Sequence, residues 1–304
     1  MTLRIGTRAS PLALAQAGWV ADLLRATGVE AELVPMRTEG DRLEEVRLGQ
    51  AGGKGLFVRE IEEALLAGGI DLAVHSLKDL PAELPAGLRL AAFPRREDPR
   101  DLLVTRGAGG LADLPPGARV GTSSLRRRAL RLAARADLTV LPMRGNVDTR
   151  LRRLDGGDCD AIVLAAAGLA RLGRTPPHAW PLEPEEFVPA VGQGILAVEA
   201  RAGDRAVLAA AAALDDPETR PCAVAERAFL RHLGGSCATP MAGHAVLEYA
   251  SLRMTGVVLS EDGRACLRDG VTGAPEDAEA VGRWLAESLL AQGAAKIAVL
   301  NPVQ

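Results

Sequence analysis

A run of hydroxyl and guanidinium side chains follows a short apolar segment near the middle of the chain. The run reads Gly121-Thr122-Ser123-Ser124-Leu125-Arg126-Arg127-Arg128. Such an order is typical of a strand that ends at a glycine turn before a helix, where backbone N–H groups and the helix dipole attract an anion. Ten arginines and two acids lie between Arg119 and Arg153, although the whole chain has a net charge of −3. We therefore predict an anion site here, whereas three adjacent arginines alone would equally fit a solvated helix face.

Two further segments place polar side chains at the ends of predicted strands. Lys78 and Asp79 follow the strand predicted over residues 71–75 and stand just before Leu80-Pro81. A carboxylate kept ionised by a neighbouring ammonium could stabilise a cation or move a proton, although a surface turn is the plain alternative. Arg8 and Ser10 follow the strand predicted over residues 3–6. Capping of the next helix accounts for Ser10 but not for Arg8.

Single cations stand in three more segments. Arg144 and Gly145 follow a strand predicted over residues 138–142, and Arg150 lies one helical turn further on. Lys54 lies in Gly52-Gly53-Lys54-Gly55, whose spacing is not that of a P-loop and indicates a mobile lid or a disordered loop. Arg171 ends a predicted helix, where a lone arginine is usually a partner of the dipole.

Cys237 is the cysteine for which the sequence suggests chemistry. It stands in Gly234-Gly235-Ser236-Cys237-Ala238-Thr239-Pro240, a flexible turn that would leave the thiol approachable. We expect Cys159, Cys222 and Cys266 to be structural, since most cysteines act as small buried hydrophobes. The four cysteines are far apart and form no Cys-x-x-Cys pair, which disfavours a zinc site and a disulfide framework. We predict no metal site.

The elements that must position these residues alternate over the first two hundred positions. Short apolar strands alternate with amphipathic helices, which predicts mostly parallel sheets covered by helices on both faces. The segments 94–99 and Pro189–Gly194 are predicted to cross between two α/β lobes, the second as a strand, with ligands in the cleft between lobes. From about Pro217 the pattern becomes α+β, with strands at 243–248 and 251–259 between two helices. The predicted domains are 1–96 with 195–213, then 100–190, and finally 217–304.

Composition limits the classes of function. The net charge of −3 argues against a general nucleic-acid coat, and no apolar run approaches the roughly 18 residues of a membrane span. The N-terminus has no long apolar segment of the secretory type. We therefore expect a cytoplasmic protein with no nucleic-acid partner and no membrane partner.

Seven segments, taken together and in order, resemble one known family. They are Arg8–Ala13, Gly52–Phe57, Ala73–Pro81, Gly121–Arg127, Leu141–Val147, Pro189–Gly194 and Gly234–Cys237. The chain resembles the porphobilinogen deaminase (hydroxymethylbilane synthase) family over nearly its full length. The resemblance implies two doubly crossed α/β lobes like those of type II periplasmic binding proteins, plus a C-terminal α+β domain, in a monomer.

The resemblance also implies a specific reaction. The family joins four porphobilinogen molecules head to tail, loses ammonia each time and releases a linear tetrapyrrole, hydroxymethylbilane, after hydrolysis. It carries a covalent dipyrromethane cofactor on a cysteine that matches Cys237, and its catalytic aspartate matches Asp79. Loss of ammonia leaves a cationic azafulvene, which the carboxylate of Asp79 can stabilise.

The pattern of basic and hydroxyl residues agrees with that reaction. Each pyrrole adds two carboxylates, which guanidinium forks hold better than ammonium does. Beside Cys237, the expected cofactor-binding residues are Lys78, Thr122, Ser123, Ser124, Arg126, Arg127, Arg144 and Gly145. The expected substrate-binding residues are Arg8, Ser10, Lys54, Arg150, Arg171 and Gln193.

Other classes of protein remain open on the residues alone. Two crossed α/β lobes also occur in solute receptors and in effector domains of regulators, and Gly121–Ser124 would suit a phosphate-ester enzyme. The lack of a signal peptide argues against a solute receptor, and the lack of a helix-turn-helix segment argues against a regulator. A phosphate-ester enzyme would need metal-ligand carboxylates near that loop, and the sequence shows none there. The chain departs from many relatives at Gln50, where they have a lysine. Arg128 is expected on the surface, and Asp148 is expected to point outward.

Overall fold

The computed structural model describes residues 2–37, 58–107, 109–236 and 238–302. Its contacts divide the chain into two compact units. Unit 1 is Met1–Glu97 with Ile195–Arg220, and unit 2 is Asp98–Gly194 with Pro221–Gln304.

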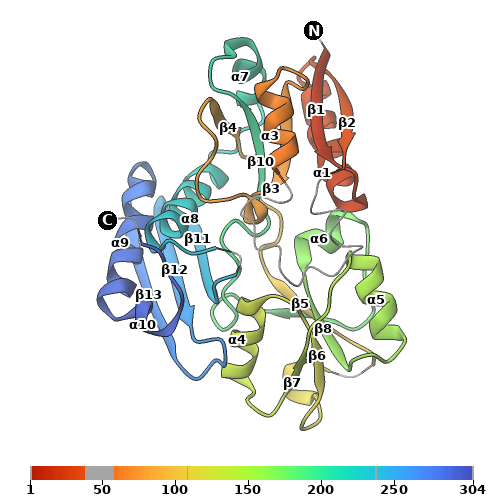
Figure 1. Cartoon of the computed structure of the whole chain (residues 1–304), viewed down its shortest axis with the longest axis vertical. Coiled ribbons are helices and arrows are strands. Elements are labelled where there is room, and N and C mark those ends of the chain that lie inside the picture. The colour runs from red at the N-terminus through yellow and green to blue at the C-terminus, as the bar shows by residue number, and fades with distance from the viewer. Residues whose placement is uncertain (1, 38–57, 108, 237, 303–304) are drawn as a thin grey trace. The chain divides into compact units, whose positions relative to one another are not determined.

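The sheet of unit 1 has five strands in the order β2-β1-β3-β10-β4 (Figure 1). Their bounds are β1 Thr2–Arg8, β2 Glu30–Met36, β3 Leu72–Ser76, β4 Leu88–Ala92 and β10 Leu196–Arg201. β1 is parallel to β2 and β3, whereas β10 is antiparallel to β3 and β4. Strands β1 to β4 therefore all run in one direction and β10 opposes them, which confirms the expectation of a mostly parallel sheet. β10 returns from a later part of the chain, as predicted, but enters this sheet in the opposite direction.

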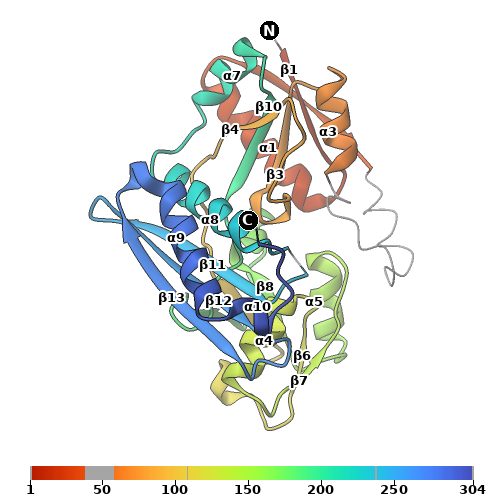
Figure 2. The same cartoon turned by 60° about the vertical axis from the view of Figure 1, so that its left-hand side comes forward.

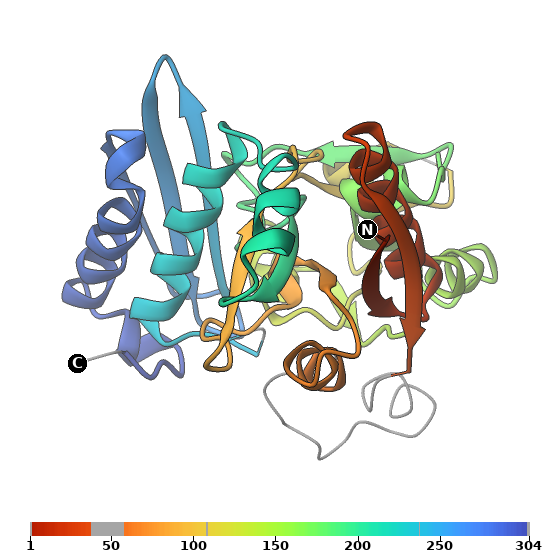
Figure 3. The same cartoon turned by 90° about the horizontal axis from the view of Figure 1, so that it is seen from above.

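Helices cover both faces of that sheet. They are α1 Pro11–Ala26, α3 Arg59–Leu66 and α7 Arg205–Ala212, and the short 3-10 helix η1, Leu77–Asp79, follows β3. Leu72 and Val74 belong to the core with α1 and α7, whereas Ala73 packs with α3. Successive side chains of a strand face opposite sides, so α3 covers one face while α1 and α7 cover the other (Figure 3).

The larger sheet of unit 2 repeats this plan, with the strand order β7-β6-β8-β5-β9. The strands are β5 Asp101–Thr105, β6 Arg119–Gly121, β7 Thr139–Leu141, β8 Ala161–Ala165 and β9 Ala179–Leu182, of which β9 was not predicted. β6 is parallel to β7 and β8, and β5 is antiparallel to β8 and β9. Helix α4, Leu125–Ala134, packs on one face; α5, Val147–Asp155, and α6, Ala166–Arg171, pack on the other.

The C-terminal part of unit 2 is an antiparallel sheet, β11-β12-β13, with helices on one face (Figure 2). Its elements are α8 Thr219–Leu233, β11 Met241–Glu248, β12 Ser251–Leu259, β13 Cys266–Gly273, η3 Pro275–Asp277, α9 Ala278–Ala291 and α10 Ala294–Ile297. Phe229 of α8 and Leu285 of α9 both lie against Gly256. A Cβ at Gly256 would stand 2.8 Å from the Phe229 ring, so the close approach requires glycine.

The opposite face of this small sheet supplies part of another core. Ala242 and Val257 pack in one cluster with Leu103, Val120 and Val163 of the larger sheet. The C-terminal elements and the second α/β lobe thus share buried apolar surface. The division of this part of the chain into two separate domains stays a prediction.

Two local expectations are wrong. Residues 191–194 form a turn rather than a crossing strand, and Gly192 and Gly194 have φ values of 74° and 87°, which favour glycine. Cys266 is exposed on the edge strand β13, whereas Cys159 and Cys222 are buried as expected.

Candidate functional site

Asp79 ends η1, directly beyond the carboxyl end of β3. Pairing of β3 with β10 continues to this point, because Leu196 faces Ser76 and the Leu77 N–H donates to the Ile195 carbonyl. The turn that follows is therefore anchored on a rigid strand end. The side chain of Asp79 is exposed and makes no hydrogen bond or ion pair with any residue that the structure describes. Its carboxylate is available to a ligand.

Three other predicted residues of unit 1 lie near strand ends. Arg8 is the last residue of β1, and Lys78 lies within η1; both are partly buried. Ser10 precedes α1, and its hydroxyl accepts a hydrogen bond from the Ala13 N–H at 3.4 Å. The capping role expected for Ser10 is confirmed.

The loop between β6 and α4 supplies the predicted hydroxyl groups of unit 2. Thr122 is buried, and its hydroxyl accepts from the Ser124 N–H. Ser124 caps α4 by accepting from the Arg127 N–H. Ser123 is the exposed member, and its hydroxyl donates to the Met143 carbonyl at 2.9 Å. This bond joins the loop to the residues that follow β7.

Arg144 and Gly145 stand immediately beyond that contact. Arg150, on the first turns of α5, donates from Nε to the Gly145 carbonyl at 2.7 Å. Gly145 has a φ of 105°, which favours glycine. Arg144 is exposed and makes no hydrogen bond or ion pair with another part of the described chain. Ser123, Arg144, Gly145 and Arg150 thus lie close together, and Arg144 is the cation without a partner among the described residues.

Arg126 and Arg127 are buried on α4 and do not face solvent. Their partner is Asp101, the first residue of β5, which is fully buried and which the sequence did not single out. Its two oxygens each accept at 2.7 Å, one from Arg126 Nη2 and the other from Arg127 Nη2. The remaining terminal nitrogens donate to the carbonyls of Val188 and Val163 at 2.8 Å.

The electrostatics of this cluster favour a further anion. Burial by itself would raise the pKa of Asp101, but the charges of Arg126 and Arg127 outweigh burial and hold that pKa well below its usual range. One carboxylate then faces two guanidinium groups, so the cluster keeps a positive charge. Burial lowers the pKa of Arg126, which Asp101 opposes. Fixed guanidinium groups with surplus positive charge suit carboxylates.

Gln193 and Arg171 join the same cluster. Gln193 Nε2 donates to the Pro99 carbonyl at 2.7 Å and to Asp101 at 3.1 Å. Arg171 Nη2 donates to the Gly194 carbonyl at 2.7 Å. Both predicted residues thus reach Asp101 or the turn beside it. The only sequence signal for Asp101 is an acid at the start of an apolar strand.

A third buried arginine was not predicted. Arg131, one turn after Arg127, is fully buried, and its guanidinium lies 5.1 Å from the centre of the Phe187 ring. Burial lowers its pKa to about 10, although the charge of Asp101 opposes this.

Two surface positions are as predicted. Asp148 is partly exposed and pairs with Arg174 at 2.9 Å. Arg128 is exposed, also as predicted.

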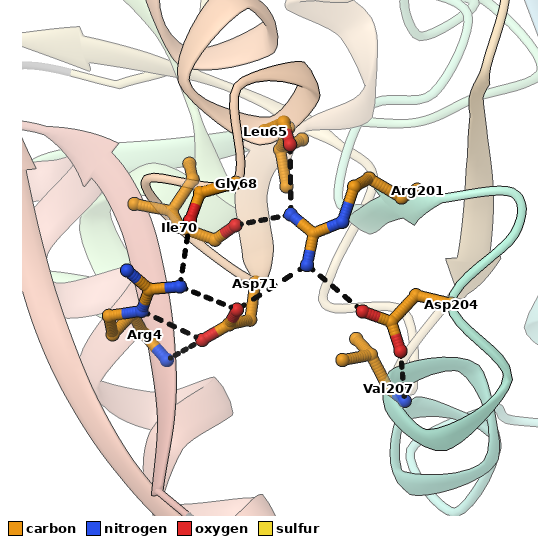
Figure 4. A network of polar contacts seen from close by, with 8 residues as sticks. All are labelled: Arg4, Leu65, Gly68, Ile70, Asp71, Arg201, Asp204 and Val207. Atoms are coloured by element: carbon orange, nitrogen blue, oxygen red, sulfur yellow. Dashed lines mark hydrogen bonds and ion pairs between the residues drawn. The ribbon is translucent and has the colours of Figure 1, made fainter.

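The opposite end of β3 carries a network of a different kind (Figure 4). Asp71 accepts from Arg4 Nη2 and from Arg4 Nε at 2.9 and 3.0 Å, and it also faces Arg201. The hydrogen bond from Arg4 holds the pKa of Asp71 below its usual range. Arg201 continues the network to Asp204 and to the carbonyls of Leu65 and Ile70. The charged side chains of Arg4, Asp71 and Arg201 all have partners, so we assign this end of the sheet a structural role.

Some predicted features lie outside the described residues. Cys237, Lys54 and Gln50 are among them. In the described part of the chain, no group of three histidine, cysteine or acidic side chains is arranged to hold a metal ion. Within that same part, every helix is too short or too polar to cross a membrane.

Two family models match the chain. Residues 3–209 match "Porphobilinogen deaminase, dipyromethane cofactor binding domain", and residues 221–291 match "Porphobilinogen deaminase, C-terminal domain". The excess of guanidinium over carboxylate around Asp101 fits a carboxylate-bearing cofactor.

Curated relatives agree over nearly the whole chain. Porphobilinogen deaminase of Syntrophotalea carbinolica is 51% identical over 297 residues, which cover 97% of this chain and 94% of the relative. That of Roseiflexus castenholzii is 52% identical over 294 residues, covering 96% and 97%. Among solved structures, the L-cystine solute receptor of Neisseria gonorrhoeae aligns with 70% of this chain and 85% of its own at a TM-score of 0.42 and 14% identity. This likeness is too weak to carry an argument, so the assignment of two α/β lobes is based on the strand orders described above. On the family models and the relatives, the chain belongs to the porphobilinogen deaminase family.

Proposed function

We propose that this chain joins four porphobilinogen molecules head to tail as a transferase, with Asp79 as its catalytic carboxylate and Cys237 as the attachment point of its dipyrromethane. The observation that carries the proposal for Asp79 is its position. The side chain is exposed at the end of a strand and has no partner among the described residues. The family membership supplies the reaction.

The role of Asp79 follows from the charge that the reaction develops. When the bond between the aminomethyl carbon and nitrogen breaks, ammonia leaves with the electron pair and the substrate becomes cationic. A nearby carboxylate stabilises that charge and accepts a hydrogen bond from the pyrrole N–H. A carboxylate already bonded to arginine, as Asp71 is, would offer less of its charge. An open carboxylate therefore suits this step.

The arginines and hydroxyls have a binding role in this proposal. Arg144, Ser123 and Arg150 form one group of donors beyond β7, and Arg126 and Arg127 form another around Asp101. The cofactor, when bound, supplies the end on which the new chain grows, and its acetate and propionate groups are the anions that these donors would hold. Lys78, Thr122, Ser124 and Gly145 complete the proposed cofactor set. Arg8, Ser10, Lys54, Arg171 and Gln193 complete the set proposed for substrate.

The finer biological setting is also proposed. We infer a cytoplasmic monomer that acts on a small molecule and needs neither nucleic acid nor membrane. The net charge of −3 supports the absence of a nucleic-acid partner.

Intact mass measurement tests the proposed attachment. The purified parent protein should carry an excess of two linked pyrrole units, and Cys237→Ser should carry none. Cys266→Ser is the matched control, because Cys266 is an exposed free thiol elsewhere in the chain. Each sample is weighed again after incubation with porphobilinogen, which separates an unloaded preparation from a wrong assignment. Pyrroles on Cys237→Ser, or none on the parent after incubation, would contradict the proposal.

A further inference from the structure

Glu226 is a buried carboxylate outside the site described above. It lies on α8 and is fully buried. Its two oxygens accept hydrogen bonds from backbone amides, one from Gly192 at 2.5 Å and the other from Ala245 of β11 at 2.8 Å. A buried carboxylate is costly unless it is bonded in this way. Glu226 therefore ties α8 to the 191–194 turn and to the small sheet.

The 191–194 turn continues the connection. Gly192 and Gly194 have positive φ, which fixes the path of the backbone on either side of Gln193. The Gln193 side chain is 1% exposed and bonds Asp101 and the Pro99 carbonyl. Arg171 holds the Gly194 carbonyl. The turn thus presents Gln193 to Asp101 from a backbone that Glu226 holds.

Asp101 completes a continuous set of contacts. It orients Arg126 and Arg127, one through each oxygen. At the other end, α8 finishes at Leu233, four residues before Cys237 in the sequence. The same helix therefore leads to the proposed attachment cysteine and holds the turn that bonds the arginine cluster.

We propose that Glu226 is a positioning residue, which fixes Gln193 and through it the orientation of Asp101 and its two arginines relative to α8. The proposal rests on the proposed function of Cys237 and of the arginines. A growing chain anchored beyond α8 needs its carboxylates to meet guanidinium groups at a set spacing. Glu226 acts only through this spacing and touches no reacting atom.

Glu226→Gln is the direct test, because it keeps the shape and replaces one accepting oxygen with a donor. KM for porphobilinogen should rise about 10- to 100-fold, while kcat changes little because Asp79 is untouched. Gln193→Met breaks the link one step further along and should raise KM in the same way. The double variant should be no worse than the worse single variant, because both changes interrupt one connection.

Leu285→Ala is the matched control, since it opens a cavity in the same C-terminal core and leaves the hydrogen-bonded connection intact. Its KM should equal that of the parent below its melting temperature. If Glu226→Gln instead behaves as Leu285→Ala does, or if the two losses multiply in the double variant, the proposal is overturned. Should Glu226→Gln fail to fold, an unchanged KM in Gln193→Met overturns it equally.

Intact mass distinguishes this proposal from the proposed function. A parent protein without pyrrole units after incubation refutes the role of Cys237. A loaded parent with parent-like kinetics in Glu226→Gln and Gln193→Met refutes the role of Glu226 and the substrate-binding role of Gln193, but leaves the role of Cys237 standing.

Discussion

Asp71 and Asp79 stand at opposite ends of β3, and their surroundings differ in almost every respect. Asp71 has a side chain that is 14% exposed, and it is bonded by Arg4 and faced by Arg201. Asp79 is exposed and has no partner among the described residues. A carboxylate whose oxygens are occupied stabilises the fold, whereas one that is open at a rigid strand end can meet a cationic substrate.

The same contrast holds for the arginines of unit 2. Arg126 and Arg127 are buried and bonded to Asp101, whereas Arg144 is exposed and has no partner in the described chain. We expect the first two to set the shape and charge of the site. Arg144 is free to follow a moving carboxylate.

Asp79→Asn should give the largest change in activity. The amide keeps the size of the side chain but removes the charge that stabilises the cation, so kcat should fall about 10²- to 10⁴-fold. The melting temperature should stay within experimental error, because no bond is lost. Steady-state consumption of porphobilinogen and thermal unfolding measure the two effects, and a parent-like kcat would refute the catalytic role.

Asp71→Asn should give the opposite result. It weakens the partly exposed contacts with Arg4 and Arg201, so the free energy of unfolding should fall by about 1–2 kcal/mol. Activity per folded molecule should remain. Denaturant unfolding gives the stability change, and loss of kcat at full folding would break the contrast between the two aspartates.

Glu62 should have a third effect, on how stability depends on pH. Its carboxyl group is buried, and unlike Asp71 it is not bonded to an arginine of the described chain. It lies near His75 and Glu199, which bond each other at 3.1 Å. Burial raises the pKa of Glu62 from 4.5 to about 7, and the charge of Glu199 adds to this. The folded protein therefore holds a proton that the unfolded chain releases between these pH values. The free energy of unfolding should fall as pH rises from 4.5 to 7, by on the order of 2 kcal/mol, and then level off.

Glu62→Gln should flatten that pH dependence, because the amide does not titrate. Unfolding free energies of parent and variant, measured at several pH values across this range, check the prediction. A difference between parent and variant that stays constant with pH through this range would show that Glu62 is already ionised in the folded state.

Sequence patterns predict residues at strand ends and helix caps better than buried residues that are held by distant partners. Strand ends, helix caps and runs of donors are local, so the positions of Asp79, Ser10 and the loop with Ser123 follow from neighbouring residues. Asp101 is bonded by residues 25 and 26 positions away and has no local signal. The burial of Arg126 and Arg127 escaped prediction for that reason.

The fold shows the same limit. Alternating apolar segments predict most helices and most strands, but not α7, and strand direction depends on pairing between distant segments, as for β10. The polar strand β13 and the short strand β9 carry weak local patterns. The turn at 191–194 has apolar neighbours like those of a strand, and only its positive-φ glycines distinguish it.

The most direct test of the contrast is the rate of the first ammonia release, measured by rapid quench on cofactor-loaded Asp79→Asn and Asp71→Asn beside the parent. The account predicts a parent-like rate for Asp71→Asn and a rate at least about 100-fold lower for Asp79→Asn. Equal rates in the two variants would contradict it.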